Sequence, residues 1–171
     1  MNYQEKSRFG IIIKLISAAG GIIVGFIICR FIFTPFRMPD SSMAPNLRSG
    51  DMLLILKHTT PKRGDIVLIE SPVEAGRVLI KRVVAAEGDT VEIKNKAFLI
   101  NNAAFDFRWK TTSSDTRIFP MSFTFRDNMP AVKLSRDQYF VLNDDLDRGF
   151  DSRTLGVIPG NLVIGRVVYK Y

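Results

Sequence analysis

One long apolar segment and a series of short ones divide the chain. Residues 9–33 are apolar almost throughout, and residues 15–29 carry no charge. A bilayer core needs about 20 such residues. Lys14 and Arg30 lie near the ends of this segment, where long basic side chains can reach the interface. The pattern therefore predicts a transmembrane helix over residues 9–33, preceded by a short basic tail over residues 1–8.

A cleaved signal peptide is the alternative interpretation of this segment. Cleavage requires small residues directly after the apolar run, whereas residues 31–35 read Phe-Ile-Phe-Thr-Pro. We therefore expect a retained anchor. The basic residues Lys6, Arg8 and Lys14 precede the segment, which favours an N-terminus inside the cell and the rest of the chain outside.

Short aliphatic runs follow the anchor, and three of them come directly after a Gly-Asp pair. These pairs are Gly50-Asp51, Gly64-Asp65 and Gly88-Asp89. A turn followed by an aliphatic run predicts a strand. Further runs predict strands at 78–85, 139–142 and 162–169, and a hairpin that turns at Asn101-Asn102.

No amphipathic helical period of useful length appears after the anchor. Residues 34–171 are therefore predicted to be mostly β, as a folded-over antiparallel sheet or barrel-like domain. Residues 106–136 are rich in phenylalanine and lack clean alternation. We expect them to form a small inserted cap.

Charge and cysteine content narrow the possible partners. The 171 residues carry a net charge of +7 and one cysteine, Cys29. One cysteine excludes an intramolecular disulfide and a cysteine-rich metal site. A basic surface suits anionic lipid or nucleic acid. Because the apolar segment predicts a membrane anchor and no nucleic-acid motif stands out, we expect membrane lipid and no nucleic acid as a partner.

The stretch Pro39-Asp40-Ser41-Ser42-Met43-Ala44-Pro45 has no helix or strand pattern. Each proline fixes its own φ and pushes the preceding residue toward extended geometry. A serine in such a loop can present its hydroxyl in one direction. The alternative is a plain linker that leaves the membrane.

Lys81 interrupts an otherwise aliphatic strand, Val78–Val84, together with Arg82. Strand side chains alternate between two faces, so one of the two cations shares a face with aliphatic neighbours. Burial there would lower the pKa of a lysine to about 7–8, at a cost of roughly 4 kcal/mol. A neutral amine could then take a proton from a serine. The alternative is a sheet edge where both charges reach water.

Taken in order, these segments resemble the bacterial type I signal peptidases, which are membrane-bound Ser-Lys endopeptidases. The resemblance covers the anchor, residues from about 31 to 105, and residues from about 139 to 171. The matching segments are Ser42-Met43-Ala44-Pro45-Asn46-Leu47 with Gly50-Asp51, Arg63-Gly64-Asp65-Ile66-Val67, Ile80-Lys81-Arg82-Val83-Val84-Ala85 with Gly88-Asp89, and Asn143-Asp144 through Asp151-Ser152-Arg153.

The resemblance implies Ser42 as nucleophile and Lys81 as general base. It also implies that the Ser42 backbone N–H helps to hold the oxyanion of the tetrahedral intermediate, and that Met43 packs beneath the serine. An ordinary core methionine is equally compatible with the sequence. The resemblance further implies two ion pairs that support the site, Arg82 with Asp144 and Arg153 with Asp151. The alternative is that both are surface ion pairs, which contribute little to stability.

By the same resemblance, the substrates are signal-peptide-bearing preproteins with small residues at positions −1 and −3 of the cleavage site. No cofactor or metal is implied. The expected location is the bacterial inner membrane, as a single-pass protein with the catalytic domain on its outer face.

Two positions depart from the family pattern. Asp40 stands two residues before the serine, where the family often has a hydroxyl or a glycine that supports the oxyanion. An ionised carboxylate cannot donate a hydrogen bond, so we expect Asp40 to turn away. Gly149 stands where some members have a serine that contacts the lysine. Ser41 is the rival nucleophile, and the match of Ser42 to the serine before methionine favours Ser42.

The sequence gives little support to a Ser-His-Asp triad or a calcium loop. His58, the sole histidine, is expected to face solvent and not to form a Ser-His-Asp triad. The acidic run Asp144, Asp145, Asp147 and Asp151 lacks the closing glutamate of a calcium loop. The alternative functions are a specialised peptidase for a pilin or conjugation substrate and an inactive membrane-anchored β binding module. A self-cleaving repressor-like protease shares the Ser-Lys arrangement, but it would have a DNA-binding domain where this chain has the predicted membrane helix.

Overall fold

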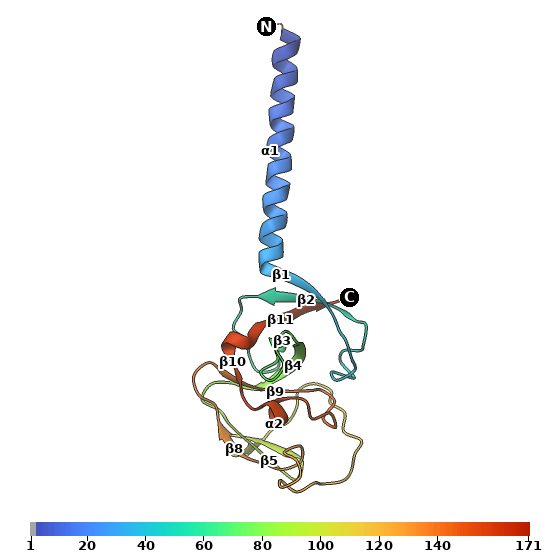
Figure 1. Ribbon diagram of the computed structural model, residues 1–171, viewed down its shortest axis with the longest axis vertical. Coiled ribbons are helices and arrows are strands. Elements are labelled where there is room, and N and C mark those ends of the chain that lie inside the picture. The colour runs from blue at the N-terminus through green and yellow to red at the C-terminus, as the bar shows by residue number, and fades with distance from the viewer. Residues whose placement is uncertain (1–2) are drawn as a thin grey trace. The chain divides into compact units, whose positions relative to one another are not determined.

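The computed structural model describes residues 3–171, and the side chains of residues 14–171. The chain divides into two compact units between Thr34 and Pro35, a boundary that falls within strand β1, Phe33–Arg37. The first unit is the helix α1, Tyr3–Ile32 (Figure 1). Most of the predicted basic tail is therefore helical, while Phe33 already begins the first strand.

Within α1, the segment Lys14–Ile32 is long and apolar enough to cross a membrane, and none of it is buried. Its 19 residues extend about 28 Å at the rise of an α-helix, close to the thickness of a bilayer core. Exposed apolar side chains include Leu15, Ile22 and Phe26. A helix that is apolar and exposed on all sides is suited to lipid.

The second unit is mostly β, as predicted. Its larger sheet has the strand order β1-β2-β11-β3-β4-β9-β10, and neighbours from β2 to β10 pair antiparallel. The strands are β1 (Phe33–Arg37), β2 (Met52–Lys57), β3 (Ile66–Glu70), β4 (Val78–Ala85), β9 (Gln138–Leu142), β10 (Ile158–Pro159) and β11 (Val163–Lys170). A short helix, α2 (Ser152–Leu155), and a 3-10 turn at Gly160–Leu162 lie between β9 and β11.

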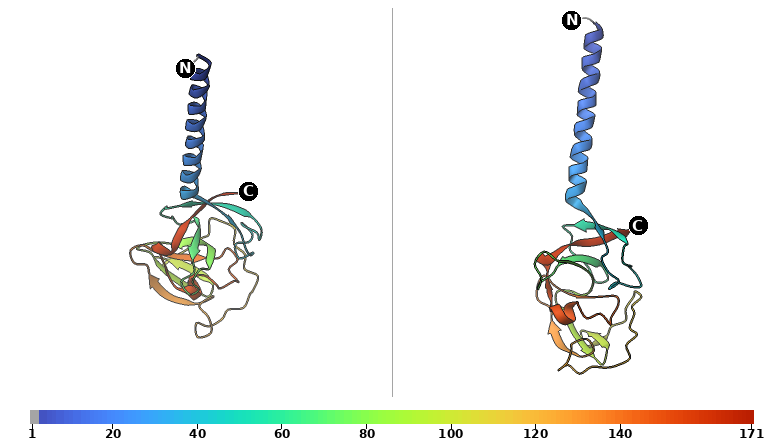
Figure 2. Two further views of the ribbon diagram at one scale, coloured as in Figure 1. Left: turned by 45° about the horizontal axis from the view of Figure 1, so that its top comes forward. Right: turned by 45° about the vertical axis from the view of Figure 1, so that its right-hand side comes forward.

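A smaller antiparallel sheet has the order β7-β6-β5-β8 and lies at the opposite end of this unit from β2 and β11 (Figures 1 and 2). Its strands are β5 (Thr90–Lys94), β6 (Ala97–Ile100), β7 (Ala103–Ala104) and β8 (Met129–Lys133). The predicted hairpin is confirmed, because β6 pairs with β7 through Asn101 and Asn102 at φ values of 53° and 62°. Asparagine tolerates such left-handed turns.

The three predicted Gly-Asp turns are also confirmed. Gly50, Gly64 and Gly88 have φ values of 93°, 95° and 86°, and they precede β2, β3 and β5. Only glycine adopts these values without strain, which explains the repeated motif.

The predicted cap differs from the structure at its end. Met129–Lys133 is strand β8, which pairs with β5 through Val91↔Val132 and Ile93↔Met129. Residues 106–128 are irregular and are held by polar contacts. Arg126 forms ion pairs with Asp115 and Asp127. Charge pairing of this kind leaves no periodic signal in the sequence.

Gly165 marks a close approach of β11 to β2. A Cβ atom there would overlap the Leu56 carbonyl oxygen and lie 2.9 Å from Ile55 Cγ2. We expect Gly165→Ala to destabilise the unit by about 2–3 kcal/mol, because two paired strands would have to separate. Urea unfolding measures this change. Gly149→Ala is the control, since its Cβ would meet only Thr154 Oγ1 at 3.8 Å; equal losses in both variants would contradict the prediction.

Candidate active site

Ser42 lies in the loop between β1 and β2 and is only 6% exposed. Backbone hydrogen bonds close this loop at its base, from Met38 N to Asp51 O (2.8 Å) and from Gly50 N to Met38 O (2.9 Å). Met38, Met43 and Leu47 anchor the loop in one hydrophobic cluster. Met43 is fully buried, so it packs in the core directly after the serine.

Lys81 lies within β4, which pairs with β3 on one side and β9 on the other. It is 3% exposed, so the alternative of an exposed sheet edge is wrong. Burial lowers the pKa of Lys81 to about 8. The charges of Asp151 and Asp40 oppose this shift, whereas Arg77 adds to it. A part of the Lys81 amine is therefore neutral near pH 7.

Asp40 turns toward Ser42, contrary to our expectation. Its Oδ1 accepts a hydrogen bond from the Ser42 backbone N–H at 2.7 Å. Burial alone would raise the pKa of the Asp40 carboxyl, but hydrogen bonds from the backbone and side chain of Ser42, with the charges of Lys81 and Arg148, hold it below its usual value. A short Asp side chain readily reaches the amide two residues on. The N–H expected to serve the oxyanion is therefore engaged.

Arg82 and Asp144 form a buried bidentate pair. Arg82 Nε and Nη2 each donate to one carboxylate oxygen of Asp144 at 2.7 Å. Asn46 Nδ2, from the serine loop, donates to the same carboxylate at 2.8 Å. The Asp145 backbone N–H donates to Ser42 O at 3.0 Å. The loop after β9 therefore connects the serine loop to β4. The alternative that Arg82 and Asp144 form an exposed surface ion pair is wrong, because both side chains are buried.

Arg153 and Asp151 form the second predicted pair, with side chains 2% and 0% exposed. Arg153 Nε and Nη2 donate to the two Asp151 oxygens at 2.9 and 2.7 Å. Asp151 also caps α2 and accepts from the Asn143 backbone N–H at 3.1 Å. Arg153 further donates to the carbonyl oxygens of Leu146 and Arg148. This pair too is buried, and it fixes the chain between β9 and α2.

The side chains of several remaining candidates lie outside these hydrogen-bonded pairs. His58 is exposed. Asp145 pairs with Arg148, and Asp147 accepts hydrogen bonds from Ser113 and Ser114. These carboxylates act as contacts within the protein.

Trp109 and Asn46 both contact the site, although the sequence alone assigned no role to either residue. The Arg82 guanidinium lies 4.8 Å from the Trp109 ring centroid. Trp109 belongs to the predicted cap, so nothing local indicated that it would contact β4. Asn46 belongs to the motif Ser42–Leu47, and membership of that motif was the one indication that Asn46 lies near the site.

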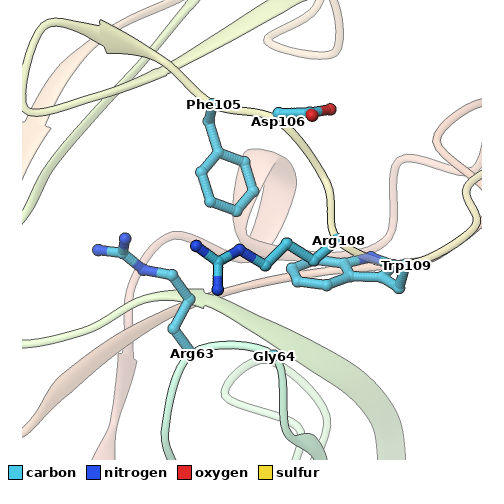
Figure 3. Close-up of a pocket in the computed structure, with 6 residues that line it drawn as sticks. All are labelled: Arg63, Gly64, Phe105, Asp106, Arg108 and Trp109. Carbon is cyan, nitrogen blue, oxygen red and sulfur yellow. The ribbon is translucent and has the colours of Figure 1, made fainter.

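A cavity of about 630 Å³ lies beside Trp109 (Figure 3). Its lining consists of Arg63, Gly64, Phe105, Asp106, Arg108 and Trp109. The Arg63 guanidinium carbon lies 5.8 Å from the Phe105 ring centroid, and Figure 3 shows the Arg108 side chain among the same lining residues. Arg63 also pairs with Asp89 at 2.7 Å. This lining includes neither Ser42 nor Lys81, so the cavity is a feature separate from the serine loop.

Known proteins match nearly the whole chain. The family model for signal peptidase, peptidase S26, matches residues 11–171. Signal peptidase I P of Bacillus subtilis subsp. natto is 30% identical over 95% of this chain and 90% of its own length. Signal peptidase IB of Staphylococcus aureus is 26% identical over 92% and 87%, respectively.

A signal peptidase I crystal structure from Enterococcus faecalis aligns with a TM-score of 0.49 and 24% identity, over 64% of this chain and 98% of that one. The family match confirms the resemblance seen in the sequence motifs. The chain therefore belongs to the signal peptidase family, peptidase S26, and it is a hydrolase.

Proposed function

We propose that this chain is a membrane-anchored serine endopeptidase that removes N-terminal signal peptides from exported preproteins with a Ser42–Lys81 dyad. One observation carries the proposal. The buried Ser42 and the buried Lys81 both interact with the Asp40 carboxylate. Asp40 accepts a hydrogen bond from the Ser42 backbone N–H, and the charge of Lys81 lowers the pKa of Asp40. The family of the chain supports this choice of reaction.

The lowered pKa gives Lys81 its chemical role. A shift from 10.5 to about 8 leaves about one-tenth of the amines neutral at pH 7, roughly 300-fold more than an unperturbed lysine. The neutral amine takes the Ser42 Oγ proton as Oγ attacks the scissile carbonyl carbon. The ammonium then protonates the departing amine, which leaves an acyl-enzyme. Lys81 next removes a proton from the water that hydrolyses the ester.

The buried ion pairs act as positioning groups in this scheme. Asp144 contacts Arg82 of β4 and Asn46 of the serine loop at once. Lys81 and Ser42 belong to the same two elements. Fixing one element against the other keeps nucleophile and base in one geometry, which is worth several kcal/mol of the barrier in well-ordered sites.

The proposed location is the bacterial inner membrane, with α1 crossing once and the β domain on the outer face. The length and composition of Lys14–Ile32 support the crossing. Lys6, Arg8 and Lys14 before the apolar core support this orientation. The net charge of +7 supports contact with anionic lipid.

The test uses the full chain reconstituted in liposomes with a preprotein that has alanine at −1 and −3. We expect one cleavage, placed at the signal-peptide junction by N-terminal sequencing of the product. A serine-reactive penem should acylate Ser42, as located by peptide mass mapping. An inactive binding module is the second candidate, favoured by the engaged Ser42 N–H. That candidate predicts neither cleavage nor acylation.

A further inference from the structure

We propose that the Asp40 carboxylate is an internal competitor of the reaction's oxyanion: it holds the Ser42 amide proton in the resting chain and must leave when substrate reacts. The inference rests on the proposed function, and it assigns a restraining role to a residue that departs from the family pattern. It makes the turnover of this chain depend on displacement of one side chain.

Geometry is the first support. Asp40 Oδ1 lies 2.7 Å from Ser42 N, within the range of a strong charge-assisted hydrogen bond. Attack by Ser42 Oγ creates an oxyanion that needs the N–H of the same residue. One N–H cannot donate at full strength to two anions. The Asp40 carboxylate and the developing oxyanion therefore compete for the same N–H group, and their negative charges repel each other.

The position of Asp40 in the loop allows it to leave. Asp40 is exposed, whereas its loop is held by the buried residues Met38, Met43 and Leu47. The hydrogen bonds of Met38 with Asp51 and Gly50 close the loop through the backbone alone. A change of the Asp40 side-chain rotamer therefore frees the Ser42 N–H without moving the serine.

The charge of Asp40 has a second effect in the same direction. Lys81 experiences the charges of Asp151, Asp40 and Arg77, and Asp40 experiences those of Lys81 and Arg148. The negative charge of Asp40 favours the protonated form of Lys81, which cannot act as a base. Removing this charge should lower the pKa of Lys81, so that the rise of activity with pH occurs at a lower pH.

Three substitutions separate the two effects. Asp40→Gly removes both the acceptor and the charge, and we expect kcat to increase about fivefold with little change in KM, since the lost competition operates in the transition state. Asp40→Ser adds a hydroxyl donor and should increase kcat at least as much. Asp40→Asn retains an acceptor for the Ser42 N–H but removes the charge. Its main effect should be a shift of the acidic limb of kcat/KM to lower pH.

The experiment measures kcat, KM and the penem acylation rate from pH 5 to 10 in the full chain, with circular dichroism of each variant. Glu70→Gln is the matched control. Glu70 is exposed at the end of β3 and is not among the charges that act on Lys81, so its profile should equal that of the wild type.

A lower kcat in folded Asp40→Gly and Asp40→Ser would overturn the inference, because Asp40 would then position Ser42 or act as a base. An unchanged rate and pH profile in all three variants would also overturn it. If the glycine variant fails to fold, kcat of the folded Asp40→Ser variant still decides the question, because that variant also lacks the carboxylate that accepts from the Ser42 N–H. Failure of the proposed function would give a different result, because neither the wild type nor any Asp40 variant would then cleave preprotein or react with penem.

Discussion

Ser42→Ala and Lys81→Met should each lower kcat for preprotein cleavage by about four orders of magnitude. The first variant lacks the attacking oxygen. The second retains an apolar side chain in the buried position of Lys81 but lacks the amine that takes the proton. Because the two groups act in one step, the double variant should be no slower than either single variant. Single-turnover cleavage of a labelled preprotein measures all three rates.

Ser41→Ala is the control for the nucleophile. Ser41 is half-buried beside Ser42 in the same loop, and its removal should change kcat by less than about threefold. Loss of cleavage in Ser41→Ala together with activity in Ser42→Ala would assign the nucleophile to Ser41. Full activity in Lys81→Met would exclude the lysine as base.

Asp151→Asn should destabilise the β unit by about 3–5 kcal/mol. The Arg153 guanidinium, whose side chain is 2% exposed, would lose the carboxylate that neutralises it, and an unpaired buried charge is costly. Such a loss is a large part of the 5–15 kcal/mol that stabilises a typical domain. Urea unfolding at pH 7 measures the loss, and a double variant with Arg153→Met should recover part of it.

The exposed pair Arg77–Glu74 is the matched control for this substitution. Its side chains are 47% and 57% exposed, so Glu74→Gln should change stability by less than about 1 kcal/mol. Similar losses in Asp151→Asn and Glu74→Gln would contradict the view that burial makes the Asp151–Arg153 pair important.

Local patterns in the sequence predicted much of this fold. The apolar run predicted α1 to within a few residues at its C-terminal end, and the Gly-Asp turns predicted the starts of β2, β3 and β5. Both signals depend on neighbouring residues only, since membrane helices need length and left-handed turns need glycine.

Contacts between distant segments were harder to predict. Strand β8 pairs with β5 although its sequence, Met-Pro-Ala-Val-Lys, shows no clear alternation. The contact of Trp109 with Arg82 joins the irregular segment to the central strand β4. The direction of the Asp40 side chain depends on a rotamer choice, which the residue type alone leaves open. The family motif supplied the pairing of Arg82 with Asp144.

The pKa of Lys81 tests the central claim most directly. The amine can be followed by NMR with isotope-labelled lysine in the full chain, with its resonance assigned by comparison with Lys81→Met. The account predicts a midpoint of about 8, matched by the acidic limb of the pH profile of kcat/KM. A midpoint near the ordinary lysine value of 10.5, with activity unrelated to it, would show a permanently charged amine and contradict its role as the base for Ser42.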